Sequence, residues 1–244
     1  MGMSKMQKFL GAMAVAAAVA VGTQTALPCF AAADKAAASD KGGEPASLDA
    51  DTVEYDMRTG IVTAEGAVLM KRGVSRVAGA KAWYNTKTQE GMVEGNVVAV
   101  REDTRVTCHK ITTDGQDHML AIGDVHGTQQ DKTFTGDMVE YFPNQNDYVK
   151  IPTGGVITSQ DGTFTADFME GWLKDEHYVG IGNAHLVSPP RKLEAGGDRM
   201  DYYGLKVNKA VLTGHAWAVQ DNNTMHGNVL TLYLAQDGQA KVSQ

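Results

Sequence analysis

Residues 50–68 read ADTVEYDMRTGIVTAEGAV, and variants of this motif recur along the rest of the chain. The first half is a small residue, then usually Asp or Asn, then apolar residues at every second position. The second half is a Gly with an apolar residue two places on. The second position of the motif is occupied in turn by Asp51, Ala80, His109, Asp137, Asp167, Asp198 and Asn228. This period of about 29 residues is typical of stacked repeat architectures.

Each of the seven repeats contains two strand patterns. Val53 and Tyr55 alternate with Thr52 and Glu54, which is the two-residue period of a half-buried strand. Turn-forming residues such as those at 85–88 (NTKT) separate one strand from the next. No part of the chain beyond its N-terminal segment sustains a helical pattern. The sequence therefore predicts an all-β protein of about fourteen short antiparallel strands.

The same alternation predicts which side chains lie inside. The inward face is apolar, whereas the opposite face carries acids such as Glu54, Glu140, Glu170 and Asp201, which we expect to be solvated. An ordinary core explains the apolar face, because every β-protein needs one, and a lining for acyl chains explains it too. The candidate lining residues are Val53, Tyr55, Val68, Tyr84, Val97, Ile111, Val125, Val139, Tyr141, Ile157, Met169, Met200, Tyr202 and Leu230.

Residues 1–33 have the features of a cleaved export signal. Lys5 and Lys8 precede an uncharged apolar run over residues 9–21, and residues 31–33 (AAA) form a small-residue cleavage site. An uncleaved inner-membrane anchor is the alternative, although the run is shorter than the ~20 apolar residues that a membrane span needs. Residues 34–47 are expected to form a flexible lead, and residues 48–244 the folded repeat domain.

Charge and cysteine content exclude several classes of protein. The whole chain has 22 basic and 29 acidic residues. Removal of residues 1–33 takes away two Lys and no acid, so the mature chain carries 20 basic and 29 acidic residues, a net charge of −9. Such an acidic surface argues against nucleic acid as a partner. The mature chain keeps only Cys108, so an intramolecular disulfide cannot form and stability must come from a core.

The residues that could carry catalysis recur once per repeat, as Asp51, Asp137, Asp167 and Asp198 do. An Asp at the start of a strand can shape a turn, whereas a catalytic pair would occur once. The sequence contains no G-x-S-x-G, HExxH or Walker motif, and its seven His residues form no HxH or HxxxH pair. We therefore predict neither an enzyme nor a metal site, and no cofactor.

The repeated motif resembles the OstA-like repeat of the periplasmic lipopolysaccharide-transport proteins, namely LptA, the periplasmic part of LptC and the N-terminal domain of LptD. Residues 51–68 and 136–141 carry the resemblance best, and it extends over roughly residues 48–242. The resemblance implies an open, V-shaped β-jellyroll whose apolar interior binds the lipid A moiety of lipopolysaccharide. It also implies a periplasmic location and end-to-end joining with LptC-like and LptD-like subunits, or with further copies in a filament.

The chain departs from the family pattern in length and in its third repeat, where His109 replaces the Asp. It could therefore hold extra repeats, or two fused modules with a boundary near residues 107–133. A cleaved signal favours an LptA-like role, whereas a retained anchor favours an LptC-like one. The alternative from another class is an exported polysaccharide-binding or adhesin-like protein, which predicts exposed aromatic residues on one flat face.

Overall fold

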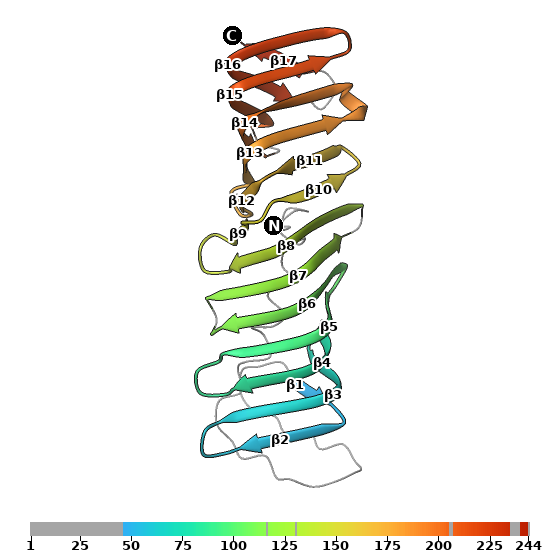
Figure 1. The fold of residues 1–244 in the computed structure, drawn as a ribbon, viewed down its shortest axis with the longest axis vertical. Coiled ribbons are helices and arrows are strands. Elements are labelled where there is room, and N and C mark those ends of the chain that lie inside the picture. The colour runs from blue at the N-terminus through green and yellow to red at the C-terminus, as the bar shows by residue number, and fades with distance from the viewer. Residues whose placement is uncertain (1–45, 116, 130, 205–206, 235–239, 244) are drawn as a thin grey trace.

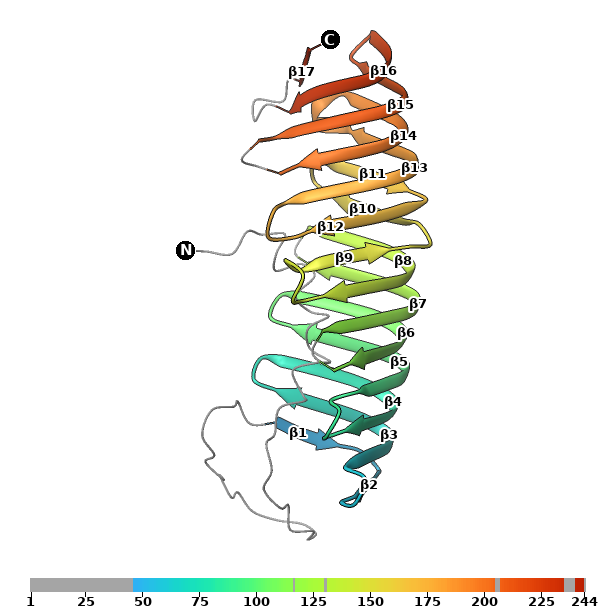
Figure 2. The ribbon, with the colours of Figure 1, turned by 90° about the vertical axis from the view of Figure 1, so that its left-hand side faces the viewer.

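The computed structural model describes residues 46–115, 117–129, 131–204, 207–234 and 240–243. The predicted signal peptide and most of the predicted lead lie outside these residues. Seventeen strands form a single sheet, and the pairings within it are antiparallel. The sheet winds into an elongated stack that starts with β1 and β2 and ends with β16 and β17 (Figures 1 and 2).

Most passes of the chain across the stack, here called rungs, are single strands of 11 or 12 residues. These are β3 (Ile61–Arg72), β4 (Ser75–Asn85), β5 (Gly91–Arg101), β6 (Thr104–Asp114), β7 (His118–Gln129), β8 (Lys132–Phe142), β13 (His177–Ser188), β14 (Leu193–Tyr203), β15 (Lys209–Gln220) and β16 (Asn223–Leu234). One short 3₁₀ helix, η1 (Pro189–Arg191), connects β13 to β14.

Three other rungs are split in two, which explains why seventeen strands correspond to the fourteen that the repeats predict. The split rungs are β1 (Ala46–Asp49) with β2 (Thr52–Asp56), β9 (Tyr148–Ile151) with β10 (Gly155–Ser159), and β11 (Gly162–Ala166) with β12 (Phe168–Trp172). Pro152 lies between β9 and β10 and has no backbone N–H for the ladder. The last rung is β17 (Ala240–Ser243), which pairs with one half of β16.

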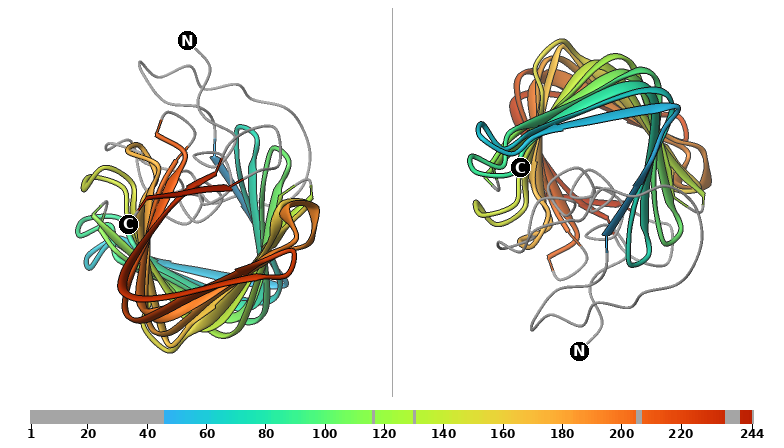
Figure 3. Two further views of the ribbon diagram at one scale, coloured as in Figure 1. Left: turned by 90° about the horizontal axis from the view of Figure 1, so that it is seen from above. Right: turned by 90° about the horizontal axis from the view of Figure 1, so that it is seen from below.

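The rungs bend at corresponding positions, so the sheet has two walls. Wall A contains β2, β9, β12 and the equivalent halves of the long strands, such as residues 61–65 of β3. Wall B contains β1, β10, β11 and the other halves, such as residues 68–72 of β3. Viewed along the stack, the rungs superpose (Figure 3). Side chains at equivalent positions therefore form lines that run along the whole molecule.

The Gly of each repeat lies at the corner between the two walls. Gly66 and Ala67 both have positive φ, +78° and +46°, and the pairing of β3 with β4 shifts between Glu65 and Val68. The same two-residue conformation recurs at residues 95–96, 123–124, 182–183 and 214–215. A β-bulge bends its strand, so the periodic Gly sets the angle between the walls.

The repeated Asp lies over the corner Gly of the neighbouring rung. A Cβ placed on Gly214 would come within 2.3 Å of Asp198 Oδ2. The Asp198 carboxylate also lies 2.9 Å from His215 Nδ1, and the side-chain amide of Asn183 donates a hydrogen bond to Asp167 at 2.7 Å. These Asp residues occupy the corner in repeat after repeat, which is the structural role that their periodicity predicts.

The predicted module boundary near residues 107–133 falls within β6, β7 and β8, which pair with one another on both walls and shift register only at the corner, as the other rungs do. The division into two modules stays a prediction. β1 begins at Ala46, two residues before the predicted start of the folded domain. Among the described residues, no helix is long and apolar enough to span a membrane.

Candidate functional site

The inward face of wall A carries two lines of side chains. The line nearer the corner is entirely apolar and contains Ala64, Ala82, Val93, Ile111, Ala121, Val139, Ile151, Met169, Met200, Leu212 and Leu230, with Gly180 between two of them. The line nearer the edge contains five tyrosines among smaller residues, and two of the tyrosines are direct register partners. Its tyrosines are Tyr55, Tyr84, Tyr141, Tyr178 and Tyr202.

Wall B carries a matching apolar line, which no polar residue interrupts from β3 to β16. Direct register partners connect each member to the next, so the line follows the hydrogen-bonded ladder. Its members are Met70, Val77, Ala99, Val106, Gly127, Phe134, Ile157, Phe164, Leu186, Ala195, Ala218 and Met225. The inward faces of the two walls are here called the trough, and these lines give it a continuous apolar path along the stack.

Most of the predicted lining residues do point into the trough. Nine of the fourteen are buried: Val68, Val97, Ile111, Val125, Val139, Tyr141, Met169, Met200 and Leu230. Tyr84, Ile157 and Tyr202 are half-buried. Val53 and Tyr55 are exposed, at 48 % and 43 %, because they lie on β2, which among the described strands pairs with β3 alone.

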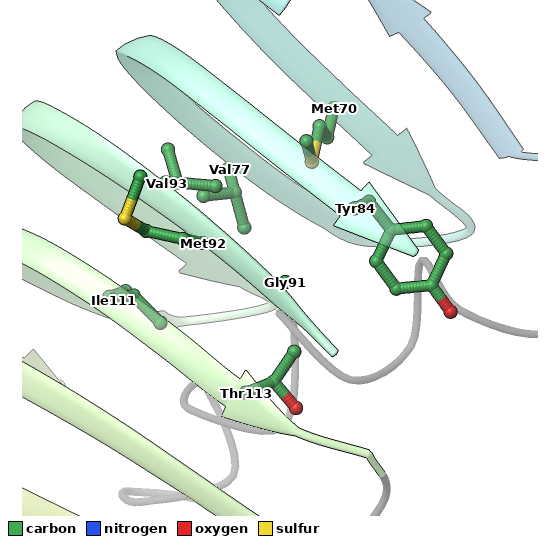
Figure 4. A pocket seen from close by; sticks show the side chains of 8 residues that line it. All are labelled: Met70, Val77, Tyr84, Gly91, Met92, Val93, Ile111 and Thr113. Carbon is green, nitrogen blue, oxygen red and sulfur yellow. The ribbon is translucent and has the colours of Figure 1, made fainter. Parts of the chain in front are cut away.

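Side chains from the two walls fill much of the trough. A small hollow, partly open to solvent, lies among β3, β4, β5 and β6 (Figure 4). Its lining residues are Met70, Val77, Tyr84, Gly91, Met92, Val93, Ile111 and Thr113. Wall A and wall B both contribute to this list, so the hollow lies between them.

The tyrosines place hydroxyl groups near the edge of wall A. Burial raises the pKa of Tyr84 to about 12 and also raises the pKa of Tyr141 and Tyr178, so the three phenols are neutral at physiological pH. Tyr141 donates a hydrogen bond to Asp147 at 2.8 Å. The buried hydroxyl of Tyr178 has no hydrogen-bond partner within the described residues. An apolar floor with polar groups near its edge suits an amphiphilic ligand.

Comparison with protein families decides the assignment. The family described as LptA/(LptD N-terminal domain) LPS transport protein matches residues 105–237, more than half of the chain. The chain belongs to this family. The resemblance seen in the repeats is thereby confirmed, and the family consists of transport proteins rather than enzymes, as the sequence predicted.

Several solved structures are similar to this chain, and one of them is that of an LptA homologue. It is the crystal structure of LptH from Pseudomonas aeruginosa, described as the LptA homologous periplasmic component of the lipopolysaccharide transport device. The match has 19 % sequence identity and a TM-score of 0.39, and it covers 43 % of this chain and 80 % of that one. No curated protein sequence matches the chain significantly.

This member of the LPS transport family also has a stack of rings on the outer face of wall A, which the repeat pattern did not predict. Successive ring centroids lie 4.6–5.6 Å apart, and Lys209 Nζ lies 4.8 Å from the centroid of the last ring. The rings, in order, are His118, Phe142, Tyr148, Trp172, His177 and Tyr203. Because they stack on one another, their faces are not free to bind sugar rings, as an adhesin would require.

The outward-facing acids beside these rings are not all solvated, contrary to the prediction from the sequence. Glu54 is exposed as predicted, but Asp201 is only 8 % exposed. Arg199 donates two hydrogen bonds to the Asp201 carboxylate, at 2.6 and 2.7 Å. Tyr148 donates one hydrogen bond to Glu170, at 2.6 Å. These acids are therefore paired beside the rings and not freely solvated. The signal that could have shown this is the run of outward aromatic residues beside successive turns.

The histidines lie apart from one another. Five of them each lie within 3.4 Å of one carboxylate, in the pairs His109–Asp124, His118–Glu140, His177–Asp201, His185–Glu194 and His215–Asp198. Within the described residues, no group of three His, Cys, Asp or Glu side chains is arranged to hold a metal ion.

Proposed function

We propose that the protein carries lipopolysaccharide across the periplasm by holding its acyl chains in the trough. The observation that supports this most directly is the uninterrupted apolar line on each wall. An ordinary folded core does not require apolar residues at one inward position of every successive strand. Membership of the LPS transport family supplies the class of cargo. The fourteen predicted lining residues are, in this proposal, the lipid-contacting set.

The physical need for such a path follows from the cost of wetting acyl chains. Each exposed CH₂ group costs about 0.8 kcal/mol, so a lipid with several chains cannot cross water unaided. An apolar trough removes that cost at each step of the passage. In this proposal, the energy and the direction of transport come from a partner that consumes ATP.

Loading requires the walls to separate. Val97, Val139 and Leu212 are 0 % exposed, so their side chains are covered by protein until lipid displaces it. The ladder bonds run between neighbouring rungs, and the two halves of each rung are joined through its corner. A small change of the corner angle therefore widens the trough without breaking the ladder. The small hollow between β3 and β6 is one place where the two walls already leave space between them.

The two ends of the stack support joining to other subunits. Exposed apolar side chains lie at both ends, Val53 and Tyr55 on β2, and Val229 and Tyr233 on β16. Edge strands can pair with the edge of another sheet. We propose that LptC-like and LptD-like subunits, or further copies of this chain, join there and continue the trough. An LptA-like role follows if residues 1–33 are cleaved, and an LptC-like role if they remain as an anchor.

Neighbouring tyrosines on opposite faces allow a direct test. Tyr202 lies in the inward line of wall A, whereas Tyr203 belongs to the outer ring stack. A photo-crosslinking phenylalanine analogue replaces each in turn in a lipopolysaccharide-producing host. We expect a lipopolysaccharide adduct from position 202 and none from position 203. Adducts from both positions, or from neither while lipid A is also missing from organic extracts of the purified protein, would contradict the proposal.

A further inference from the structure

The outermost inward positions of wall B break the apolar pattern in the first half of the stack. One step beyond Met70 and Val77 of the apolar line, the register partners become polar on six successive rungs. We call these six residues the lip: Arg72, Ser75, Arg101, Thr104, Gln129 and Lys132. Each lies two positions from a residue of the apolar line on its own strand. Because side chains two positions apart share one face of a strand, the lip faces the trough and not the outer surface.

The lip has a charge opposite to that of the protein as a whole. Arg72, Arg101 and Lys132 are cations in a mature chain of net charge −9. The turns beside them carry the acids Glu102, Asp103 and Asp131, of which Asp103 accepts a hydrogen bond from the Gln129 amide at 3.1 Å. Equivalent positions in the second half of the stack are uncharged: Ser159, Gly162, Ser188, Leu193, Gln220 and Asn223. At these register positions the cations therefore lie only on β3, β5 and β8. At the edge of the second half, Arg191 of η1 donates a hydrogen bond to Ser188 at 3.2 Å and is paired with Asp161 at 3.3 Å.

Two further observations show that the lip belongs to the trough. Arg72 and Arg101 are half-buried. The positive charge of each also acts on the pKa of a wall A tyrosine: Arg72 lowers that of Tyr84 and Arg101 that of Tyr141, although burial has the larger, opposite effect. Gln129 is only 3 % exposed, and its Oε1 has no hydrogen-bond donor within the described residues. A buried acceptor without a donor is costly, so a ligand that supplies an O–H or N–H would stabilise it.

We propose that the lip binds the phosphorylated sugar headgroup of the amphiphile whose acyl chains lie in the trough. Arginine suits phosphate because its planar guanidinium can donate two parallel hydrogen bonds. Arg72 and Arg101 are two rungs apart, about 10 Å at the usual strand spacing, so a headgroup with two phosphates can engage both. Gln129 Oε1 accepts from a headgroup hydroxyl or amide. This inference rests on the proposed transport function and assigns the headgroup a position along the stack.

The test compares binding of purified lipopolysaccharide before and after enzymatic removal of its phosphates. In the lip variant Arg72→Gln/Arg101→Gln, we expect affinity for the phosphorylated lipid to fall about tenfold or more, and affinity for the dephosphorylated lipid to stay within twofold. The matched control is Arg76→Gln/Arg105→Gln. Arg76 and Arg105 lie on the same wall, one residue from the lip, but point outward and are exposed, so both affinities should be unchanged.

Equal losses for both lipids, or no loss for either, would overturn the role of the lip while leaving the transport function standing. Wild-type protein that binds neither lipid would instead overturn the transport function and this inference with it. Inorganic phosphate that binds lipid-free protein as tightly as the lipid does would show a free-phosphate site and refute headgroup recognition. If the double variant does not fold, Lys132→Gln replaces it, with an expected loss of about threefold for the phosphorylated lipid alone.

Discussion

Replacing a corner glycine should destabilise the protein far more than replacing an ordinary turn glycine. Gly214 has φ +71°, a conformation that costs an L-residue about 1–2 kcal/mol. In Gly214→Ala, the new Cβ would also lie 2.3 Å from Asp198 Oδ2 and 2.9 Å from its Cβ. The carboxylate can rotate away, but the Cβ moves only with the backbone. We expect a loss of about 2–4 kcal/mol in the free energy of unfolding, from strain and overlap together.

Two further variants separate the strain from the overlap. Gly115 has φ +65°, but a Cβ there would meet its nearest neighbour at 3.7 Å, so Gly115→Ala reports strain alone, about 1–2 kcal/mol. Asp198→Gly removes the overlapping atoms, so the double variant Asp198→Gly/Gly214→Ala should lose less than the sum of its two single changes, by about 1 kcal/mol or more.

Urea unfolding followed by circular dichroism measures the free energy of unfolding of the wild type, of each single variant and of the double variant. Gly214→Ala that costs no more than Gly115→Ala, or a double variant whose losses simply add, would refute the view that Asp and Gly are matched across each corner. The corner angle sets the separation of the walls, so the same variants should also change lipid uptake.

Three other predictions concern the trough, a buried acid and the thiol. Met169 is 3 % exposed, so Met169→Asp should abolish recovery of lipid A with the folded protein, because a carboxylate is costly among acyl chains, whereas Met169→Leu should retain it; equal recovery from both variants would count against the trough. Burial raises the pKa of Asp201, but hydrogen bonds from Arg199 and His177 outweigh it and hold that pKa below its ordinary value. Stability from this group is therefore present above pH ~4 and lost as the pH falls further, and Asp201→Asn should flatten the acid limb of the unfolding curve; an unchanged acid limb would argue against the pairing. Burial raises the pKa of Cys108 to about 11, so iodoacetamide at pH 8 should label it only after unfolding, and rapid labelling of the folded protein would show that the thiol is accessible.

The repeats made the fold and the inward face predictable. Alternation places Val139 and Met169 on the same face because a strand has a period of two, and a period near 29 residues implies two rungs per repeat. The Asp and Gly positions were recognisable as structural for the same reason. The strand count differs from the prediction only where a rung is split in two at the corner, as in the rung made of β9 and β10. Pro152 indicates that split, but the repeat pattern does not.

The outer ring stack and the lip required the tertiary structure. Rings such as Trp172 and His177 come from adjacent rungs, but Phe142 and Tyr203 are 61 residues apart in the chain, and only the register of successive strands brings them into one stack. In the sequence, Asp201 occupies the same repeat position as the exposed Glu54. Its burial therefore could not be predicted from that position and depends on the side chains that the tertiary structure places around it.

By itself, then, the sequence determined the all-β repeat, the apolar inward face and the family, because each depends on local periodicity and on residue type. The tertiary structure alone decided that Arg72 and Arg101 lie two rungs apart along one edge of the trough, and that Gln129 is buried on the same edge two rungs further on. Strand register and the corner angle place these groups, and both are properties of the assembled sheet, which no single repeat contains.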